Sequence, residues 1–230
     1  MKKIMILSML TALTFGAFAQ ETETRQFDNF SAIEVGTAIE LIITQGNTNE
    51  AIVEVNDIDL EDVITEVRGS ELNIKRRSRN NTNNTNNRGE VVVRLTYKSI
   101  DELSVNSAAS IYSKSVIKAT DFELNASSAG NAELELDVTD LRVKVSSAGS
   151  LELSGTCASM DLDASSAGKL DGYDLVCGAI KADVSSGGSG RVSVKDKLEV
   201  DAGTGGSLYY KGDPDKVLAD TNLGGRVQKR

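Results

Sequence analysis

Apolar and polar residues alternate with a period of two through the second half of the chain, from about residue 100 to residue 230. Examples are Leu141-Arg142-Val143-Lys144-Val145 and Met160-Asp161-Leu162-Asp163-Ala164. Alternation of this kind predicts β-strands that bury one face. A short run of Ser, Ala and Gly separates each alternating segment from the next, as in Ala126-Ser127-Ser128-Ala129-Gly130.

These small-residue runs recur evenly. Their last residues are 109, 130, 149, 168, 188, 206 and 225, with spacings of 21, 19, 19, 20, 18 and 19 residues. Such a repeat predicts an all-β fold, a single-stranded parallel β-helix (β-solenoid) of about 19 residues per coil, whose strands stack about 4.8 Å apart. Tandem β-hairpins fit less well, because they need paired strands and Asn-Gly type turns inside each repeat. At the corners we expect inward-facing Ala and Ser, and Gly where the chain bends with positive φ.

The first half of the chain shows the same alternation less regularly, as in Ile39-Glu40-Leu41-Ile42-Ile43 and Val91-Val92-Val93-Arg94-Leu95. We therefore predict one solenoid domain over residues 30–230, with regular coils at 100–230 and further, looser coils before them. Residues 20–29 are polar and are expected to be flexible, and 60–67 is expected to be a strand. The basic and Asn-rich stretch 75–89 lacks apolar residues and is predicted to be a disordered loop.

The amino terminus has the pattern of a secretory signal peptide. Lys2 and Lys3 precede an apolar run from Ile4 to Phe18, and Ala17-Phe18-Ala19 forms an A-x-A cleavage site. We predict that residues 1–19 are removed, and that the protein is exported to the periplasm, the cell surface or the medium. An uncleaved anchor is the alternative, but the run is short for a span of about 20 residues. We expect no membrane span after cleavage.

Residues at equal offsets from the turns should stack in columns. Seven positions before the turn ends lie Glu102, Glu123, Arg142, Asp161, Lys181 and Glu199, whose charges alternate from Glu123 onward and favour the correct register. Two positions nearer the turn lie Asp163, Asp183, Asp201 and Asp220. This aspartate column suggests a calcium site, because calcium prefers hard oxygen ligands. A solvated acidic face with no ligand is the simpler interpretation, and calcium is the only cofactor that the sequence suggests.

The two cysteines occupy equivalent positions in neighbouring coils. Cys157 lies 11 residues before Gly168, and Cys177 lies 11 residues before Gly188. Stacked Cα atoms fall within the range of about 4.4–6.8 Å that a disulfide spans. For an exported chain we therefore predict a Cys157–Cys177 disulfide.

Composition excludes several classes of catalysis, metal site and partner. The chain of 230 residues contains no His, no Trp, 5 Phe and 5 Tyr, and its net charge is −9. The absence of His excludes Ser-His-Asp and Cys-His nucleophilic catalysis and His-ligated metal centres, so the Ser-rich turns are interpreted as structural. The acidic balance argues against nucleic-acid binding.

Several motifs in combination resemble those of the putative auto-transporter adhesin, head GIN domain family. They are Phe30-Ser31-Ala32-Ile33-Glu34-Val35, Gln45-Gly46, Glu71-Leu72-Asn73-Ile74, Leu103-Ser104-Val105-Asn106-Ser107-Ala108-Ala109 and the Ser-Ser-Ala-Gly coils that follow. The resemblance spans about residues 27–212 and implies a right-handed parallel β-helix in an exported protein. It supplies no catalytic residues.

The sequence therefore favours an exported, non-enzymatic β-solenoid with an adhesin-like or cell-envelope role and a surface glycan or protein as partner. Two alternatives stay open: a polysaccharide-active enzyme that uses the aspartate column, and a calcium-stabilised structural repeat. Parallel β-helices often host polysaccharide lyases and hydrolases, although few aromatic residues are available here to hold a sugar. Exposed strand edges at the ends of a solenoid also leave homo-oligomerisation open.

Overall fold

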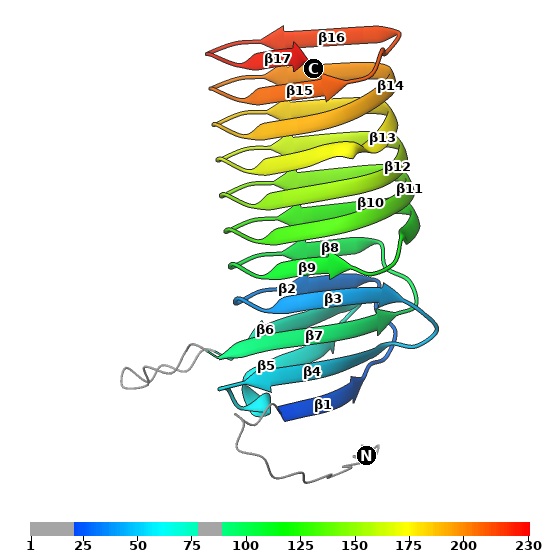
Figure 1. The fold of residues 1–230 in the computed structure, drawn as a ribbon, viewed down its shortest axis with the longest axis vertical. Coiled ribbons are helices and arrows are strands. Elements are labelled where there is room, and N and C mark those ends of the chain that lie inside the picture. The colour runs from blue at the N-terminus through cyan, green and yellow to red at the C-terminus, as the bar shows by residue number, and fades with distance from the viewer. Residues whose placement is uncertain (1–20, 78–88) are drawn as a thin grey trace.

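The computed structural model describes residues 21–77 and 89–230, which form a β-solenoid whose coils stack along one long axis (Figure 1). The predicted signal peptide and residues 78–88 of the Asn-rich stretch lie outside the described residues. Within the described part, the predicted loop is shorter than expected at its start, because Lys75 and Arg76 complete a strand. The predicted solenoid is confirmed, with about 7 turns of about 19 residues each.

The regular coils begin at β8 and run to the carboxyl terminus as parallel strands. The long strands β11 to β14 each bend around one edge of the solenoid, and a tight turn reverses the chain at the other edge (Figure 1). The strands are β8 (Glu102–Val105), β9 (Ser110–Ser113), β10 (Ile117–Ala126), β11 (Asn131–Val145), β12 (Ser150–Ala164), β13 (Lys169–Val184), β14 (Ser189–Ala202), β15 (Ser207–Lys211), β16 (Lys216–Thr221) and β17 (Arg226–Lys229).

Each coil contributes to two sheet faces. We call the outward surface of β8, β10, β16 and the later halves of β11–β14 the pre-turn face. The outward surface of β9, β15, β17 and the early halves of β11–β14 is the post-turn face. Residues at equal offsets from the turns pair in register, for example Asp161 with Lys181 and Asp163 with Asp183. The columns inferred from the repeat are therefore present.

The Ser-Ser-Ala-Gly turns have a different geometry from the one expected. In the turn that ends at Gly130, the Gly130 N–H donates to the Ser127 carbonyl over 2.8 Å. The two middle residues, Ser128 and Ala129, have φ values of 50° and 61° and are exposed, as in a type I′ turn. The expected inward-facing Ser and Ala were thus wrong at these positions. Hydrogen bonds between neighbouring turns, such as Ala129 N–H to the Ser147 carbonyl at 3.0 Å, hold this geometry.

The glycine that ends each turn from Gly130 onward is required by close stacking rather than by φ. A Cβ atom on Gly168 would lie 2.3 Å from the Val145 carbonyl oxygen of the preceding coil. By contrast, Gly187 occupies a middle position with φ of 75°, and a Cβ there would meet nothing within 4 Å. Gly therefore serves two distinct purposes at these corners, and the expectation of positive φ holds only for the second.

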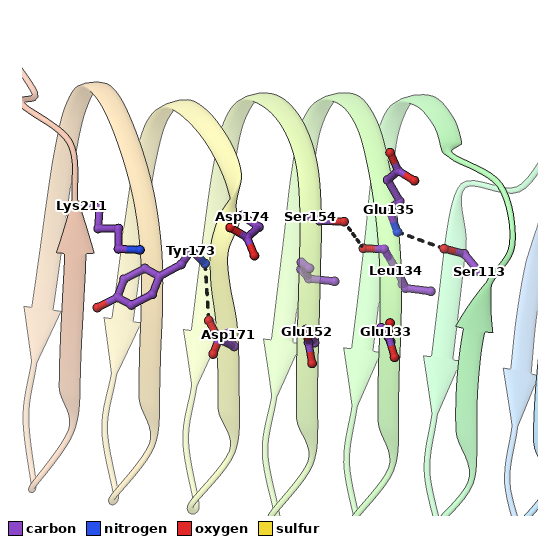
Figure 2. A pocket seen from close by; sticks show the side chains of 11 residues that line it. Ser113, Glu133, Leu134, Glu135, Glu152, Ser154, Asp171, Tyr173, Asp174 and Lys211 are labelled. Atoms are coloured by element: carbon purple, nitrogen blue, oxygen red, sulfur yellow. Dashed lines mark hydrogen bonds between the residues drawn. The ribbon is translucent and has the colours of Figure 1, made fainter. Parts of the chain in front are cut away.

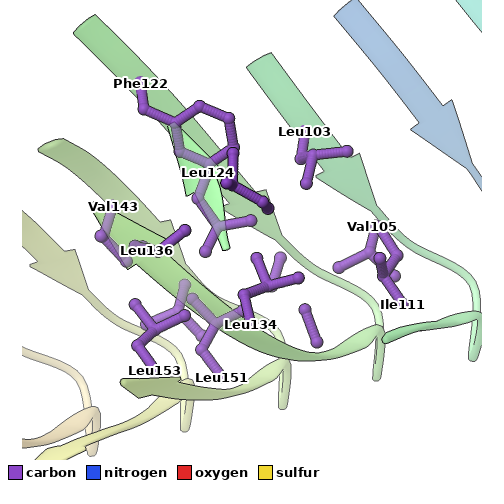
Figure 3. Close-up of a cluster of buried hydrophobic side chains, with 14 of the residues drawn as sticks. Leu103, Val105, Ile111, Phe122, Leu124, Leu134, Leu136, Val143, Leu151 and Leu153 are labelled. Atoms are coloured by element: carbon purple, nitrogen blue, oxygen red, sulfur yellow. The ribbon is translucent and has the colours of Figure 1, made fainter. Parts of the chain in front are cut away.

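Inward side chains of both faces interleave in one apolar core. Aliphatic residues from successive coils stack in this core, with Phe122 beside Leu124 (Figure 3). The core continues into the amino-terminal strands and includes Tyr97, which is only 1% exposed. The Tyr97 hydroxyl has no hydrogen-bond partner, and burial raises the pKa of Tyr97 to about 12.

Tyr97→Phe is expected to raise the free energy of unfolding by about 1 kcal/mol at pH 7, because it removes an unpaired buried hydroxyl. The pH dependence has a defined sign. The pKa of Tyr97 is about 10 in the unfolded chain and about 12 in the folded protein. The stability that the parent gains from keeping Tyr97 protonated is therefore complete below pH 10. It is lost as the pH rises through 12. Urea unfolding should show a larger advantage of the Phe variant at pH 11 than at pH 7, because at pH 11 Tyr97 is ionised mainly in the unfolded parent, which lowers the parent's free energy of unfolding. Equal stability of the two proteins at both pH values contradicts the assignment.

The amino-terminal end departs from the predicted parallel coils. The elements are β1 (Glu21–Gln26), β2 (Ala32–Val35), β3 (Glu40–Gln45), β4 (Glu50–Asn56), a 3₁₀ turn at Leu60–Asp62, β5 (Val63–Arg68), β6 (Glu71–Arg76) and β7 (Glu90–Tyr97). β2 and β3 continue the parallel sheets next to β8 and β9. β4 pairs antiparallel with both β7 and β1, and β5 pairs antiparallel with β6. β6 and β7 pair parallel with β2 and β3, so the expectation of further parallel coils holds for these four strands and was wrong for β1, β4 and β5. The strand expected at 60–67 is confirmed only from Val63 onward.

Residues 21–26 were expected to be flexible and instead form β1. The side chain of Arg25 anchors this strand beneath the core. Its guanidinium donates to the carbonyls of Val63 at 2.6 Å and Leu60 at 3.0 Å, and pairs with Glu23 at 2.6 Å. This end of the solenoid is thus closed by an antiparallel strand with an inward charged group, a device that discourages edge-to-edge pairing.

The predicted disulfide is confirmed. Cys157 of β12 and Cys177 of β13 lie in register, with Cα atoms 4.5 Å apart, and their sulfur atoms are bonded. Both residues are buried, with exposed fractions of 7% and 0%. The bond therefore links two adjacent coils inside the core.

Candidate functional site

A column of polar residues runs along the outside of the post-turn face. Glu133, Glu152 and Asp171 lie in register on β11, β12 and β13. The column continues through Arg191 on β14 to Tyr209 on β15. Because the repeat places one member on each coil, side chains far apart in sequence form one continuous strip.

A groove of about 360 Å³ lies along the acidic part of this strip (Figure 2). Five carboxylates and one lysine contribute to its wall. The lining residues are Ser113, Glu133, Leu134, Glu135, Glu152, Leu153, Ser154, Asp171, Tyr173, Asp174 and Lys211. The Ser113 hydroxyl accepts a hydrogen bond from the Glu135 backbone N–H at 3.0 Å, which fixes one end of the groove.

Tyr173 enters the groove because β13 is irregular at this point. The register between β12 and β13 shifts between Glu152 and Ser154, and the pairing of β13 with β14 shifts after Gly172. An extra residue in a strand re-aims a side chain and is common at functional sites. Figure 2 shows the Tyr173 ring beside the Lys211 ammonium, which lies 4.1 Å from the ring centroid.

A second concavity of about 470 Å³ adjoins the first and shares Tyr173. Its lining alternates aromatic and cationic groups, namely Tyr173, Arg191, Tyr209 and Arg230. The Arg230 guanidinium lies 4.9 Å from the Tyr209 centroid, and Arg191 pairs with Asp171 at 2.9 Å. The post-turn face thus passes from acidic to basic along the solenoid, with Tyr173 at the boundary.

The pre-turn face contains the charge columns predicted from the repeat. Glu123 accepts a hydrogen bond from Lys144 at 2.9 Å and lies 4.0 Å from Arg142. The hydrogen bond from Lys144 is the largest of the effects that lower the pKa of Glu123. One coil earlier, burial and then the charge of Glu123 raise the pKa of Glu102.

The four aspartates of the proposed calcium column are exposed and stacked in register on β12, β13, β14 and β16. Asp183, Asp201 and Asp220 line a shallow hollow of about 580 Å³ that also includes Lys181 and Glu199, whereas Asp163 lies outside its lining. Among the residues that the structure describes, no group of three or more Asp, Glu, Cys or His side chains could hold a metal ion. Calcium binding by this column stays a prediction.

Sequence reasoning did not identify the groove. It counted the aromatic residues as too few to hold a sugar, and it did not place Tyr173, Arg191 or Lys211 at a site. One signal was available: residues 172–175, Gly-Tyr-Asp-Leu, interrupt the strict alternation of the neighbouring coils. Such an interruption inside a regular repeat is typical of a bulge.

A family described as putative auto-transporter adhesin, head GIN domain, matches residues 29–214. The chain belongs to this family. The fold is shared with solved structures of two proteins described as putative adhesins. One is from Bacteroides fragilis, with a TM-score of 0.81, 16% identity, and coverage of 93% of this chain and 98% of the other. The other is from Parabacteroides distasonis, with a TM-score of 0.73, 18% identity, and coverage of 94% and 98%.

A third solved structure, from Parabacteroides distasonis, is described as a putative lipid binding protein. It has a TM-score of 0.68 and 20% identity, and the alignment covers 91% of this chain and 96% of the other. At these identities the likeness establishes the fold alone. No curated protein matches the chain. Within residues 21–77 and 89–230, helices of the length and apolar character needed to cross a bilayer are absent.

Proposed function

We propose that this protein is a non-enzymatic, adhesin-like module that is exported and binds a surface glycan along its post-turn face. The observation that carries the proposal is the pair of adjoining concavities that meet at Tyr173. Solenoids commonly bind partners along such extended repeat surfaces. Membership of an adhesin-named family supports the same role.

The chemistry of the two concavities suits a polyhydroxylated chain. Carboxylates such as Glu152 and Asp171 accept hydrogen bonds from hydroxyl groups, and charged acceptors make these bonds stronger than neutral ones. Tyr173 and Tyr209 offer apolar ring faces with polar hydroxyl edges, which suits the mixed surface of a sugar. The guanidinium of Arg191 can contact a hydroxyl or an acidic sugar substituent beside Tyr209.

A polysaccharide-active enzyme remains the alternative, because Asp183, Asp201 and Asp220 line a hollow on the opposite face. Glycoside hydrolysis needs an acid and a second carboxylate held at a defined separation across the scissile bond. The aspartates here are exposed and stand beside the last coil of the solenoid. We favour the binding function because the post-turn face combines carboxylates, cations and aromatic rings.

The test is binding to surfaces coated with a panel of neutral and uronic-acid polysaccharides. The Tyr173→Ala/Tyr209→Ala double variant should bind about tenfold more weakly than the parent, because truncating Tyr anchors at a binding hot spot costs more than about 1 kcal/mol. Tyr112→Ala is the matched control, since Tyr112 precedes Glu133 in the same column but lies outside both concavities. Equal binding by the parent and the double variant, or release of new reducing ends from the polysaccharide, would contradict the proposal.

A further inference from the structure

The two ends of the solenoid differ in how their core residues and strand edges are covered. At the amino-terminal end, β1 and the Arg25 side chain cover the core. At the other end, Val217 and Ala219 of β16 follow the inward columns of Leu198 and Val200, yet both are exposed. In the described part of the chain, β16 pairs along one edge only, with β14. The carboxyl-terminal end thus presents an unpaired strand edge with uncovered apolar side chains.

The outward side chains of β16 form a self-complementary series. Lys216, Leu218 and Asp220 point outward, in register with Lys197, Glu199 and Asp201. A positive charge, Lys216, and a negative charge, Asp220, lie at equal distances in sequence on either side of Leu218, which is 44% exposed. If a second β16 lies antiparallel with its Leu218 opposite the first, each Lys216 faces an Asp220 of the other copy. The same register places Val217 opposite Ala219 on the inward side.

We propose that the protein forms a two-fold symmetric dimer by antiparallel pairing of β16 with β16 of a second copy, with the axis passing by Leu218. Isologous contacts of this kind are the commonest way in which soluble chains associate. The pairing satisfies the free backbone groups of two strand edges. It also covers Val217 and Ala219 with the corresponding residues of the partner.

The charged residues at the end of each copy also favour the dimer. Lys216 stacks on Lys197, and Asp220 stacks on Asp201, so the last coil ends in two like-charged columns. Like charges in direct cross-strand positions are destabilising. In the dimer, each end residue gains an oppositely charged neighbour from the second copy. On the other face, Lys229 of β17 is already paired with Asp213, which limits repulsion between the two basic β17 strands.

Head-to-tail stacking fits less well. It would place the exposed apolar residues of β16 against the amino-terminal end, where Glu23 and Arg25 lie beneath the core. The carbonyl groups that Arg25 binds are already satisfied there. Apolar side chains would then cover charged groups without offering them hydrogen bonds, which is costly. The two-fold arrangement instead brings apolar groups together.

The first test is the molar mass of the protein in solution, measured by sedimentation equilibrium. The parent should be dimeric, and Lys216→Asp or Asp220→Lys alone should weaken dimerisation at least fivefold. The double variant Lys216→Asp/Asp220→Lys should restore it, because the pairs are reversed rather than removed. Asp163→Lys is the matched control, with the same charge change in the same column but on β12, away from the edge. A monomeric parent, or single variants that dimerise like the parent, would overturn the proposal.

The second test uses a cysteine at the two-fold axis. Directly opposite residues in an antiparallel pair have Cα atoms about 4.5–5.5 Å apart, which a disulfide can span. Leu218→Cys should therefore form a covalent dimer under mild oxidation. Leu223→Cys is the control, because Leu223 is 81% exposed but lies in the turn, away from the axis. Cross-linking of Leu223→Cys to the same extent as Leu218→Cys would count against the predicted register.

Discussion

Gly168→Ala is expected to lower the free energy of unfolding by about 3 kcal/mol, the upper part of the range for overpacking a close-fitting interior. A Cβ atom at this position would lie 2.3 Å from the carbonyl oxygen of Val145 and 2.8 Å from the backbone nitrogen of Ser146. Both atoms belong to the backbone of the preceding coil, whose hydrogen bonds to the next coil fix its position. The contact can be relieved only by separating the two coils. Urea unfolding followed by circular dichroism measures the effect.

The matched control is Gly187→Ala in the next turn. Gly187 has φ of 75°, and a Cβ atom there meets nothing within 4 Å. Ala129, Ala148 and Ala167 occupy the equivalent position of three other turns with φ of about 60°. The cost should therefore be about 1 kcal/mol, that of a left-handed conformation for an L-residue. Equal losses for the two variants would show that φ, and not the stacking distance, determines the need for glycine.

The regular coils could be predicted from sequence because one physical constraint repeats. Each coil must place its apolar residues inside and its turn above the preceding turn, so equal offsets become neighbours in space. The pairing of Cys157 with Cys177 and the charge alternation from Glu123 to Glu199 follow from that constraint alone. The register of neighbouring strands could thus be predicted from the repeat alone.

The amino-terminal end could not be predicted in the same way, because alternation with a period of two does not distinguish parallel from antiparallel strands. The polar sequence of β1 also concealed its structure. The strand pairs with β4 and is anchored by Arg25, whose partners lie 35 to 40 residues later. A single charged side chain that binds distant carbonyl groups leaves no periodic signal.

The candidate site was missed for a related reason. Its position depends on an irregularity in β13, where Tyr173 lies among residues that break the repeat. The regular coils explain where Glu133, Glu152 and Asp171 stand, but they do not indicate that this strip is concave. The concavity arises where the repeat is violated. In repeat proteins of this kind, a break in the pattern therefore indicates a candidate site better than the most regular motif does.

The Cys157→Ala/Cys177→Ala double variant is expected to lose about 3 kcal/mol of unfolding free energy, because the disulfide closes a loop of 20 residues and restricts the unfolded chain accordingly. The native coils should persist, since the two positions are already neighbours through backbone pairing. Urea unfolding of the parent with and without reductant, beside the double variant, measures the effect. Reductant should lower the stability of the parent toward that of the variant and leave the variant unchanged. A parent that is insensitive to reductant under conditions that reduce both sulfurs would show that the stacked strands alone determine the order of these coils.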